Sequence, residues 1–215
     1  MAENNADYSK QEYWEERYKS EPKYDWFTSR YEDIVNLLDK TFRKLGDPSA
    51  LKILHLGCGN SSLGPDLYRR GFKNIINIDY SVVVIENMAK EYSQEMPEMT
   101  WMAMDVRDLK YEDGAFDIVI DKALMDTFQA DKESETMDDD IDRMLMEASR
   151  VTKNGGYFYQ ITWEIPYLRM SWTKQDKYNW DITYEIIGDN DMYRLFTYAK
   201  HQNSSSAVEN AVADQ

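Results

Sequence analysis

From Leu51 onward the chain alternates short apolar runs with stretches in which apolar residues recur every three or four positions. The first pattern is typical of buried strands and the second of amphipathic helices. Strands are predicted at residues 51–56, 74–79, 100–105, 116–121 and 156–163. Helices are predicted between them at residues 61–71, 81–93 and 136–152. The chain is expected to close with an antiparallel hairpin of residues 180–187 and 191–200.

The residues before the first strand form an N-terminal segment, 11–46, for which two helices are predicted. A short helix at residues 11–19 puts Trp14 and Tyr18 on one face, one helical turn apart. A second amphipathic helix begins at about Ser29.

Strands that alternate with helices imply an α/β fold, in which helices cover both faces of a mostly parallel sheet. No repeat or Pro-rich linker divides the chain, so one domain is predicted for residues 1–203. Within it residues 1–9 are expected to be disordered, and residues 204–215 to form a flexible tail. Because such sheets bind ligands at the carboxyl ends of their strands, a functional site is expected there.

The formal net charge is −15, from 25 basic and 40 acidic residues. This excess disfavours a nucleic acid partner, because phosphate binding needs clustered Lys and Arg. It fits either a surface that is merely soluble or one that attracts a basic partner.

Two further features bear on the compartment. No apolar run is long enough to span a membrane, and the first residues lack the pattern of a secretory signal. The single cysteine, Cys58, cannot form an internal disulfide, which fits a reducing compartment. A cytoplasmic protein without a membrane partner is therefore expected.

The apolar strand at 51–56 leads directly into Gly57-Cys58-Gly59 and then into a helix, which suggests a ligand site. Glycine permits positive φ and lets the polar groups of a ligand come close to the backbone. The turn lacks the Gly-Lys-Ser/Thr of a Walker loop, and Ser62 replaces the third glycine of the dinucleotide fingerprint. The turn alone leaves a phosphate and other polar ligands open.

Two acids at the ends of the next predicted strands narrow the choice of ligand. Asp79 has the spacing from Gly59 of a carboxylate that accepts hydrogen bonds from two ribose hydroxyls. Asp105 can accept from the exocyclic amine of adenine, while the backbone N–H of Val106 donates to a ring nitrogen. These groups predict an adenosine site without a pyrophosphate clamp, which suits S-adenosylmethionine. The alternative is that the acids only cap helices or turns.

Several motifs together resemble one family, the small seven-strand methyltransferases related to elongation factor 1-alpha lysine methyltransferase 4. They are EYWEERY with YDWF, LGCGNSSLGPDLY, INIDYSVVVIENM, WMAMDVRDL and FDIVIDKALMD. The likeness runs from about Tyr13 to the last strand, and it extends to the N-terminal half of a larger methyltransferase-like relative. The resemblance implies a Rossmann-like class I methyltransferase fold of seven strands with an antiparallel last strand. It also implies methylation of a protein lysine.

The family's cofactor contacts, carried over position by position, fall on Trp14, Tyr18, Trp26, Gly57, Asp79, Tyr80, Asp105, Val106 and Lys122. The glycine turn adds Gly59. The resemblance favours a lid over the methionine end of the cofactor, formed by Trp14, Tyr18 and Trp26 within the segment 11–46. Without the resemblance, aromatic residues on a helix are usually part of the core.

The resemblance also marks DKALMD, from Asp121 to Asp126, as needed for activity. Relatives typically carry Glu at the position of Asp121 and Gly-Thr at the positions of Ala123 and Leu124. As candidate catalytic residues, Asp121 and Asp126 would orient the incoming amine or remove its proton. A salt bridge or a helix cap is the alternative for each.

The remaining chemistry-bearing residues point to no metal site. Cys58 has no evident His or Asp partner and is expected to pack, and His55 is expected to be buried and neutral. The acidic segment 131–142 is either a solvated helix start or a docking surface for a basic protein. The aromatic residues after the fifth strand, among them Trp163 and Trp172, either shape a substrate pocket or belong to the core.

We therefore expect an S-adenosylmethionine-dependent protein lysine N-methyltransferase that releases S-adenosylhomocysteine. By resemblance its substrate is elongation factor 1-alpha, a basic protein. A small-molecule methyltransferase, a nicotinamide-dependent oxidoreductase and a non-catalytic regulator are the alternatives. The protein is expected to be a monomer or a weak dimer.

Overall fold

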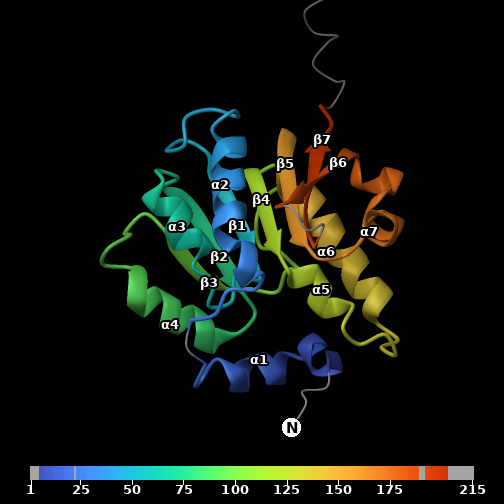
Figure 1. The fold of residues 1–215 in the computed structure, drawn as a ribbon, viewed down its shortest axis with the longest axis horizontal. Helices are drawn as coiled ribbons and strands as arrows, with labels where there is room; N and C mark the ends of the chain where they lie inside the picture. Colours follow the sequence, from blue (N-terminus) through green and yellow to red (C-terminus); the bar gives the residue numbers. More distant parts are fainter. Residues whose placement is uncertain (1–4, 22, 189–191, 203–215) are drawn as a thin grey trace, which may run out of the picture.

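The computed structural model describes residues 5–21, 23–188 and 192–202, and its centre is a seven-stranded sheet (Figure 1). The strands are β1 (Lys52–Leu56), β2 (Asn74–Asp79), β3 (Thr100–Ala103), β4 (Phe116–Lys122), β5 (Thr152–Thr162), β6 (Trp180–Ile187) and β7 (Tyr193–Lys200). The α-helices are α1 (Gln11–Arg17), α2 (Tyr31–Phe42), α3 (Leu63–Arg69), α4 (Val82–Tyr92), α5 (Leu124–Phe128), α6 (Met137–Val151) and α7 (Pro166–Thr173). Short 3-10 helices are η1 (Asn5–Ser9), η2 (Thr28–Arg30) and η3 (Asp176–Tyr178).

The strands lie in the order β3-β2-β1-β4-β5-β7-β6. β1 pairs in parallel with β2 and β4, β3 pairs in parallel with β2, and β5 with β4. β7 runs antiparallel to both β5 and β6. The predicted Rossmann-like sheet with an antiparallel last strand is thus confirmed. Strands β1 to β5 end at one edge of the sheet, where the predicted site residues are found.

Side chains that alternate along the strands supply two hydrophobic cores, one on each face of the sheet. Ile53 and Ile118 belong to the core that α2, α3 and α4 cover. Leu54 and Val119 belong to the other core, which α6 covers with Met144 among its buried residues. Figure 1 shows these two helical layers on either side of the sheet.

Several boundaries differ from the sequence prediction. Residues 5–9, expected to be disordered, form η1, where the carbonyl of Tyr8 accepts a hydrogen bond from the Trp14 indole at 2.8 Å. β5 begins at Thr152, before the predicted residue 156, because Thr152 already pairs with Phe116 of β4, ahead of an irregularity in the register. The short helices α5 and α7 were not predicted, since each is too brief to show periodicity. The predicted tail, 204–215, lies outside the described residues.

The segment predicted as lid helices, 11–46, divides into two parts. α2 packs against the sheet with Ile34, Val35, Leu38 and Phe42 buried, so it is a structural layer and not a lid. α1 instead lies across the edge at which the parallel strands end (Figure 1). The lid prediction therefore applies only to the residues before η2.

The chain leaves β4 through a strained turn. Ala123 has φ 69° and ψ 1°, in the left-handed region, which costs a residue with a side chain about 1–2 kcal/mol. The turn directs Leu124 over the glycine turn, so that a Cβ on Gly57 would lie 2.6 Å from Leu124 Cδ1.

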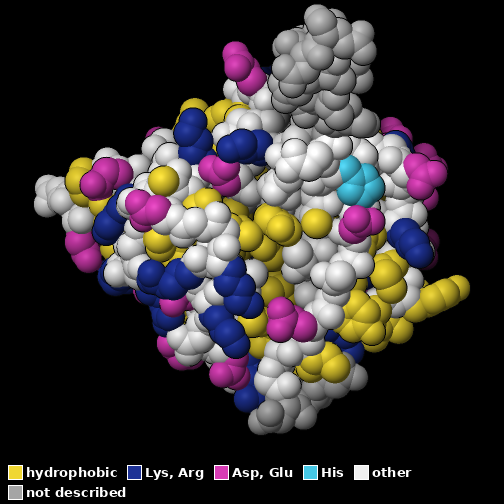
Figure 2. Space-filling model, turned by 90° about the horizontal axis from the view of Figure 1, so that it is seen from above, with side chains coloured by type: hydrophobic (Ala, Val, Ile, Leu, Met, Phe, Trp, Pro, Cys, Tyr) yellow, Lys and Arg dark blue, Asp and Glu magenta, His cyan; other side chains and the backbone are white. Residues whose placement is uncertain are grey.

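The surface carries both signs of charge. At the end of the molecule opposite α1, Lys and Arg side chains gather beside Asp and Glu (Figure 2). Among the described residues, no helix combines the length and the apolar character needed to cross a bilayer.

Candidate functional site

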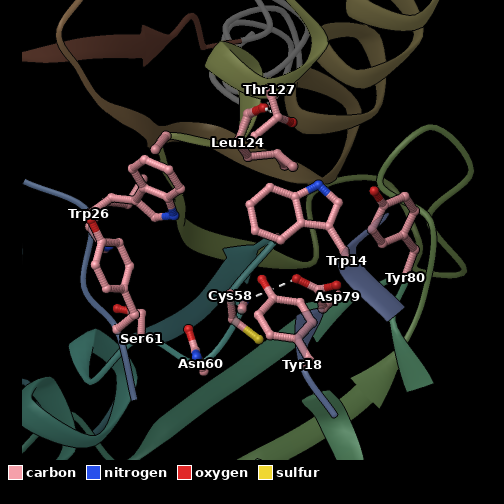
Figure 3. Close-up of a pocket in the computed structure, with 15 residues that line it drawn as sticks. Trp14, Tyr18, Trp26, Cys58, Asn60, Ser61, Asp79, Tyr80, Leu124 and Thr127 are labelled. Atoms are coloured by element: carbon pink, nitrogen blue, oxygen red, sulfur yellow. Dashed lines mark hydrogen bonds between the residues drawn. The ribbon is translucent and has the colours of Figure 1, made fainter. Parts of the chain in front are cut away.

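Two adjoining pockets open at the carboxyl ends of the parallel strands. They share five lining residues: Gly57, Asp79, Tyr80, Leu124 and Thr127. The first, the aromatic pocket, continues under the N-terminal segment (Figure 3). The second, the Asp105 pocket, continues towards the end of β3. Every residue predicted to contact the cofactor lines one or both: Trp14, Tyr18, Trp26, Gly57, Gly59, Asp79, Tyr80, Asp105, Val106 and Lys122.

The glycine turn forms the floor that the pockets have in common. Gly57 and Gly59 have φ of 53° and 52°, a conformation that glycine adopts freely. A Cβ on Gly59 would lie 2.7 Å from the Tyr18 hydroxyl oxygen. The N–H of Cys58 donates to the carbonyl of Ile78 at 2.9 Å, which fastens the turn to β2. Any larger side chain at either glycine would displace a wall of the pocket.

Asp79 ends β2 and is buried at the wall shared by the two pockets. Its carboxylate accepts hydrogen bonds from the N–H groups of Gly59, at 3.0 Å, and Ser81, at 2.9 Å. Burial raises the pKa of Asp79 to about 6, although these hydrogen bonds oppose the rise. At neutral pH the group is therefore ionised. Each oxygen keeps lone pairs for a further donor, such as a hydroxyl.

Asp105 lies just beyond β3 and is held by Arg107. The guanidinium contacts the Asp105 carboxylate at 2.7 Å and that of Asp140, in α6, at 2.8 Å. Burial acts to raise the pKa of Asp105, but Arg107 outweighs it and keeps that pKa below its ordinary value. Asp105 is thus an ionised acceptor in a fixed position, with buried Val106 next to it in the pocket lining.

Aromatic rings form the outer wall of the aromatic pocket. Trp14 stacks on Tyr18 with ring centroids 5.5 Å apart, and Trp26 meets Trp14 edge to face at 6.5 Å. Figure 3 shows the three rings around the cavity, opposite Leu124 and Thr127. The cavity is therefore bounded by π faces on the side of the N-terminal segment.

α1 is fastened to the N-terminus of α4, next to Asp79. The Glu15 carboxylate accepts hydrogen bonds from the Val82 N–H and the Ser81 hydroxyl, each at 3.0 Å. The Gln11 amide donates to the carbonyl of Tyr80 at 3.1 Å. These contacts hold the aromatic wall over the glycine turn.

Lys122, at the end of β4, brings a buried cation into the lining of the aromatic pocket. Its ammonium lies 3.5 Å from the carboxylate of Asp25. Burial lowers the pKa of Lys122, and Asp25 partly offsets that effect. Asp25 also accepts a hydrogen bond from the N–H of Ser62 at 3.1 Å, so it links the N-terminal segment to the start of α3.

Asp121 does not line either pocket. Its buried carboxylate accepts hydrogen bonds from the N–H groups of Leu124, at 2.7 Å, and Met125, at 3.3 Å, and from the Gln160 amide at 2.8 Å. Burial, followed by the charge of Asp126, raises the pKa of Asp121 to about 6. The contacts match the alternative role of a helix cap, here for α5, because an acceptor for its first N–H groups sits at its start.

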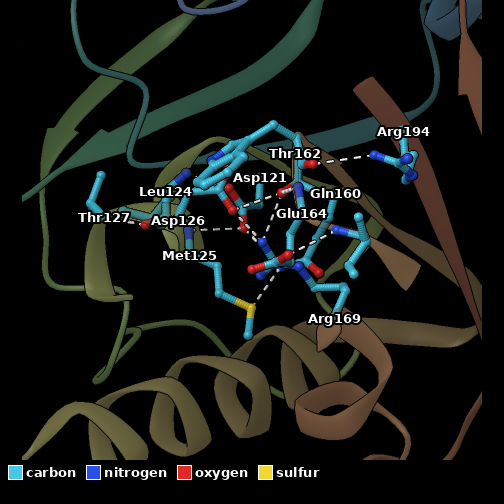
Figure 4. A network of polar contacts seen from close by, with 12 residues as sticks. Asp121, Leu124, Met125, Asp126, Thr127, Gln160, Thr162, Glu164, Arg169 and Arg194 are labelled. Carbon is cyan, nitrogen blue, oxygen red and sulfur yellow. Dashed lines mark hydrogen bonds and ion pairs between the residues drawn. The ribbon is translucent and has the colours of Figure 1, made fainter. Parts of the chain in front are cut away.

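Asp126 also lies behind the pocket wall (Figure 4). It forms an ion pair with Arg169, whose side chain is fully buried, and accepts a hydrogen bond from the Thr162 hydroxyl at 2.7 Å. Burial raises the pKa of Asp126 against the opposing effect of Arg169. The contacts of Asp121 and Asp126 match the alternatives of a helix cap and a salt bridge, and neither residue lines a pocket. That they act on the incoming amine stays a prediction.

Several residues of the site were missed by the sequence prediction. Asp25 stands inside the YDWF motif, so its neighbours already marked it. Glu15 and Arg107 also stand inside quoted motifs, EYWEERY and WMAMDVRDL. The motifs did not show their roles, because their partners come from other elements. Leu124 and Thr127 face the cavity only because α5 exists, and that helix was not predicted.

The predictions for the single cysteine and the strand histidine are confirmed. Cys58 is buried, and burial raises the pKa of its thiol. His55 is buried, which lowers its pKa to about 4, and it therefore stays neutral. In the part of the chain that the structure describes, no group of three or more His, Cys, Asp or Glu side chains is arranged to hold a metal ion.

Comparisons with known sequences agree with this geometry. A family model described as a methyltransferase domain matches residues 54–160. The EEF1A lysine methyltransferase 4 of Mus musculus is 32% identical over 97% of this chain and 81% of its own length. The Bos taurus protein of the same name is 31% identical over 96% and 82%. The Homo sapiens eEF1A lysine and N-terminal methyltransferase is 31% identical over 75% of this chain, which is only 22% of that protein.

Solved structures share the fold. Magnesium protoporphyrin IX methyltransferase from Synechocystis PCC 6803 superposes with a TM-score of 0.62 at 12% identity, over 93% of this chain and 99% of that one. PH0226 protein from Pyrococcus horikoshii OT3 also gives 0.62, at 22% identity, over 86% and 98%. Identities this low support the fold and nothing more specific.

Proposed function

Because this chain belongs to the family of EEF1A lysine methyltransferase 4, we propose that it transfers methyl groups from S-adenosylmethionine to a lysine of eEF1A. Membership makes it a methyltransferase. The identity of the protein substrate comes from the names of its relatives and belongs to the proposal.

The observation that supports this proposal is that the family-matched residues all line two adjoining pockets, which share five residues. They come from the N-terminal segment and from the ends of four strands, β1 to β4, yet all of them line the two joined pockets. Residues that only cap separate helices or turns, which was the alternative for the acids, would be spread over the molecule. These residues instead meet at one place, although they come from distant parts of the chain.

The side chains present suit S-adenosylmethionine. Asp79 offers a carboxylate for ribose hydroxyls where the two pockets meet. The rings of Trp14 and Tyr18 offer π faces to a sulfonium cation, an attraction worth about 0.5–2 kcal/mol. Lys122 offers an ammonium group to the carboxylate of the cofactor's methionine part. When bound, the cofactor supplies an electrophilic methyl group.

The protein's own task is to place a neutral lysine amine in line with that methyl group. A free lysine has a pKa of about 10.4, and removal of water by Trp14, Trp26 and Tyr24 would lower it. Alignment of the two reactants can lower the barrier by about 7–11 kcal/mol. In this scheme Asp121 and Asp126 are positioning residues, because they fix α5 and with it the Leu124 wall.

The test is transfer of a labelled methyl group to purified eEF1A. We expect label on a lysine, located by mass spectrometry, and loss of the label with Asp79→Ala. Glu16→Ala is the matched control, since Glu16 lies on α1 but is exposed. Label that appears only in small molecules would favour a small-molecule methyltransferase. Cofactor binding without transfer to any acceptor would favour a regulator.

We also propose that the protein substrate is basic, that the enzyme is located in the cytoplasm, and that it is a monomer or a weak dimer. Light scattering across a range of concentrations measures the last of these.

A further inference from the structure

Large hydrophobic side chains are exposed in a short segment directly after β5. The exposed fractions are 60% for Trp163, 47% for Ile165, 80% for Tyr167 and 44% for Leu168. Tyr167 is the most exposed large hydrophobic residue in the described part of the chain. We call residues 163–168 the α7 ridge. Contiguous exposed apolar side chains usually mark a site of interaction.

Buried polar contacts hold the ridge from beneath (Figure 4). Arg169, fully buried, pairs with Asp126 and donates to the Thr162 hydroxyl at 2.8 Å. The same hydroxyl accepts a hydrogen bond from the N–H of Glu164 at 3.0 Å. The backbone under the ridge is therefore fixed before any partner arrives, which reduces the entropy lost on binding.

These contacts also join the ridge to the cofactor site. Asp126 lies in α5 between Leu124 and Thr127, which line both pockets. The Thr162 hydroxyl that supports the ridge lies 2.7 Å from the Asp126 carboxylate. A protein docked on the ridge would thus sit beside the wall of the aromatic pocket.

Acidic side chains lie beside the C-terminal end of α7, the helix on which the ridge ends. Asp138 and Asp139, at the start of α6, line an open surface pocket together with Trp172 of α7. Lys177 lines the same pocket but is engaged in an ion pair of its own. Among the described residues, Asp138, Asp139 and Glu164 take part in no ion pair. Unpaired carboxylates beside an apolar face attract a cationic protein surface.

We infer that the α7 ridge, together with Asp138 and Asp139, is the docking surface for the basic protein substrate. The inference rests on the proposed function, since it assigns a binding surface to the same substrate. Tyr167 and Leu168 supply apolar anchors, and the two aspartates attract the partner's basic side chains. Docking here presents a lysine to the aromatic pocket. In Figure 2, hydrophobic side chains project from the flank on which α7 lies.

Paired variants test this inference. The ridge variant is Tyr167→Ala with Leu168→Ala, and the charge variant is Asp138→Asn with Asp139→Asn. The control is Tyr184→Ala with Ile186→Ala on edge strand β6, where both residues are 48% exposed. Purified eEF1A is the probe, and its Kd is measured in the presence of S-adenosylhomocysteine. The KM and kcat of methyl transfer and the affinity for S-adenosylmethionine are measured alongside.

We expect the ridge variant to raise KM and Kd by about tenfold or more, as lost interface anchors do. Its kcat and its cofactor affinity should stay near those of the wild type. The charge variant should raise KM and reduce the dependence of kcat/KM on salt. The control should behave as the wild type.

The outcomes separate the inference from the proposed function. If the wild type methylates eEF1A and the ridge variant matches the control, the docking surface is overturned and the proposed function stands. If the wild type binds eEF1A through the ridge but transfers no methyl group, the proposed function is overturned and the docking surface stands. If the wild type neither binds nor methylates eEF1A, both are overturned.

Discussion

Among single residues, Asp79 is the one at which folding and cofactor binding make opposite demands. Its pKa of about 6 in the folded protein exceeds the reference value of 3.8, so burial disfavours the ionised form. The folded state then binds the proton more tightly, and the stability that Asp79 contributes falls as pH rises from about 4 to 6. Recognition of ribose hydroxyls needs the ionised form, so binding should improve over the same range.

The first prediction concerns the pH dependence of Asp79→Asn. In the wild type, the affinity for S-adenosylmethionine should fall about tenfold for each pH unit below 6. In the variant it should be weak and flat. The variant should also gain stability relative to the wild type as pH rises from 4 to 7. Calorimetric titration and thermal denaturation across this range measure the two trends, and a wild-type affinity that is constant with pH would refute the assignment.

The aromatic wall supplies the second prediction, at Trp26. Trp26→Ala removes one ring from the lining, and binding of S-adenosylmethionine should weaken by about 1–3 kcal/mol. Because Trp26 is only half-buried, the melting temperature should change little. Titration calorimetry measures the affinity, and a value equal to that of the wild type would remove Trp26 from the site.

The site residues that were predicted from sequence are positioned by the end of a strand. Those that were missed are positioned by contacts between elements that are distant in the chain. Asp79 and Asp105 could be found because consecutive parallel strands end at one edge, so a strand boundary already places them. Arg107 could not, since its role depends on where α6 brings Asp140. For Asp121 and Asp126 the sequence left a catalytic role and a structural role open, because the turn at Ala123, which decides where α5 and its carboxylates point, leaves no periodic signal.

At the scale of elements, α1 is held in position by its contacts with the rest of the protein. A helix of seven residues has too few internal hydrogen bonds to be stable alone. The Glu15 carboxylate contributes by accepting hydrogen bonds at the start of α4. The strength of these contacts therefore determines what fraction of the time α1 holds the aromatic wall over the cofactor site.

The third prediction is that Glu15→Ala loosens this wall without touching the cavity. Loss of a capping acceptor costs about 0.5–2 kcal/mol, so cofactor affinity should fall severalfold. Amide hydrogen exchange in α1 should become faster, as mass spectrometry can detect. Glu16→Ala, on the exposed side of the same helix, should leave both quantities unchanged. Equal exchange in the two variants would contradict the fastening.

α5 and α7 are joined by the buried pair of Asp126 and Arg169. Removing one member leaves the other charge buried and unpaired, which is more harmful than losing a surface pair. Neither helix was predicted from sequence, because each is short and is positioned by this pair and not by a repeating apolar face. The pair is thus an example of tertiary contacts that define secondary structure.

The fourth prediction is that Arg169→Met destabilises the protein by about 3–5 kcal/mol. Adding Asp126→Leu should restore part of that loss, because the orphaned carboxylate is removed too. Arg69→Met, which removes two surface ion pairs, with Asp66 and Glu95, should cost no more than about 1 kcal/mol. Urea denaturation gives the three values. A double variant no more stable than Arg169→Met would argue against an unpaired-charge penalty.

At the scale of the whole molecule, the overall layout was predictable and the site's surroundings were less so. The mostly parallel sheet and its two covered faces follow from the alternation of predicted strands and helices. The site, by contrast, contains features that oppose stability, such as the buried carboxylates Asp79 and Asp121 and the turn at Ala123. Domains are stable by only about 5–15 kcal/mol, so these features are a noticeable fraction of the total.

The left-handed turn at Ala123 therefore offers a route to a more heat-resistant protein. Ala123→Gly removes about 1–2 kcal/mol of backbone strain from the folded state. It also costs about 0.5–1 kcal/mol of stability, because glycine makes the unfolded chain more flexible. The net gain should raise Tm by about 1–4 °C in calorimetry. Ala50→Gly, at a position outside the left-handed region, should lower it. A protein engineer would begin at this turn, where one methyl group of the pocket lining can be removed while the backbone keeps its course.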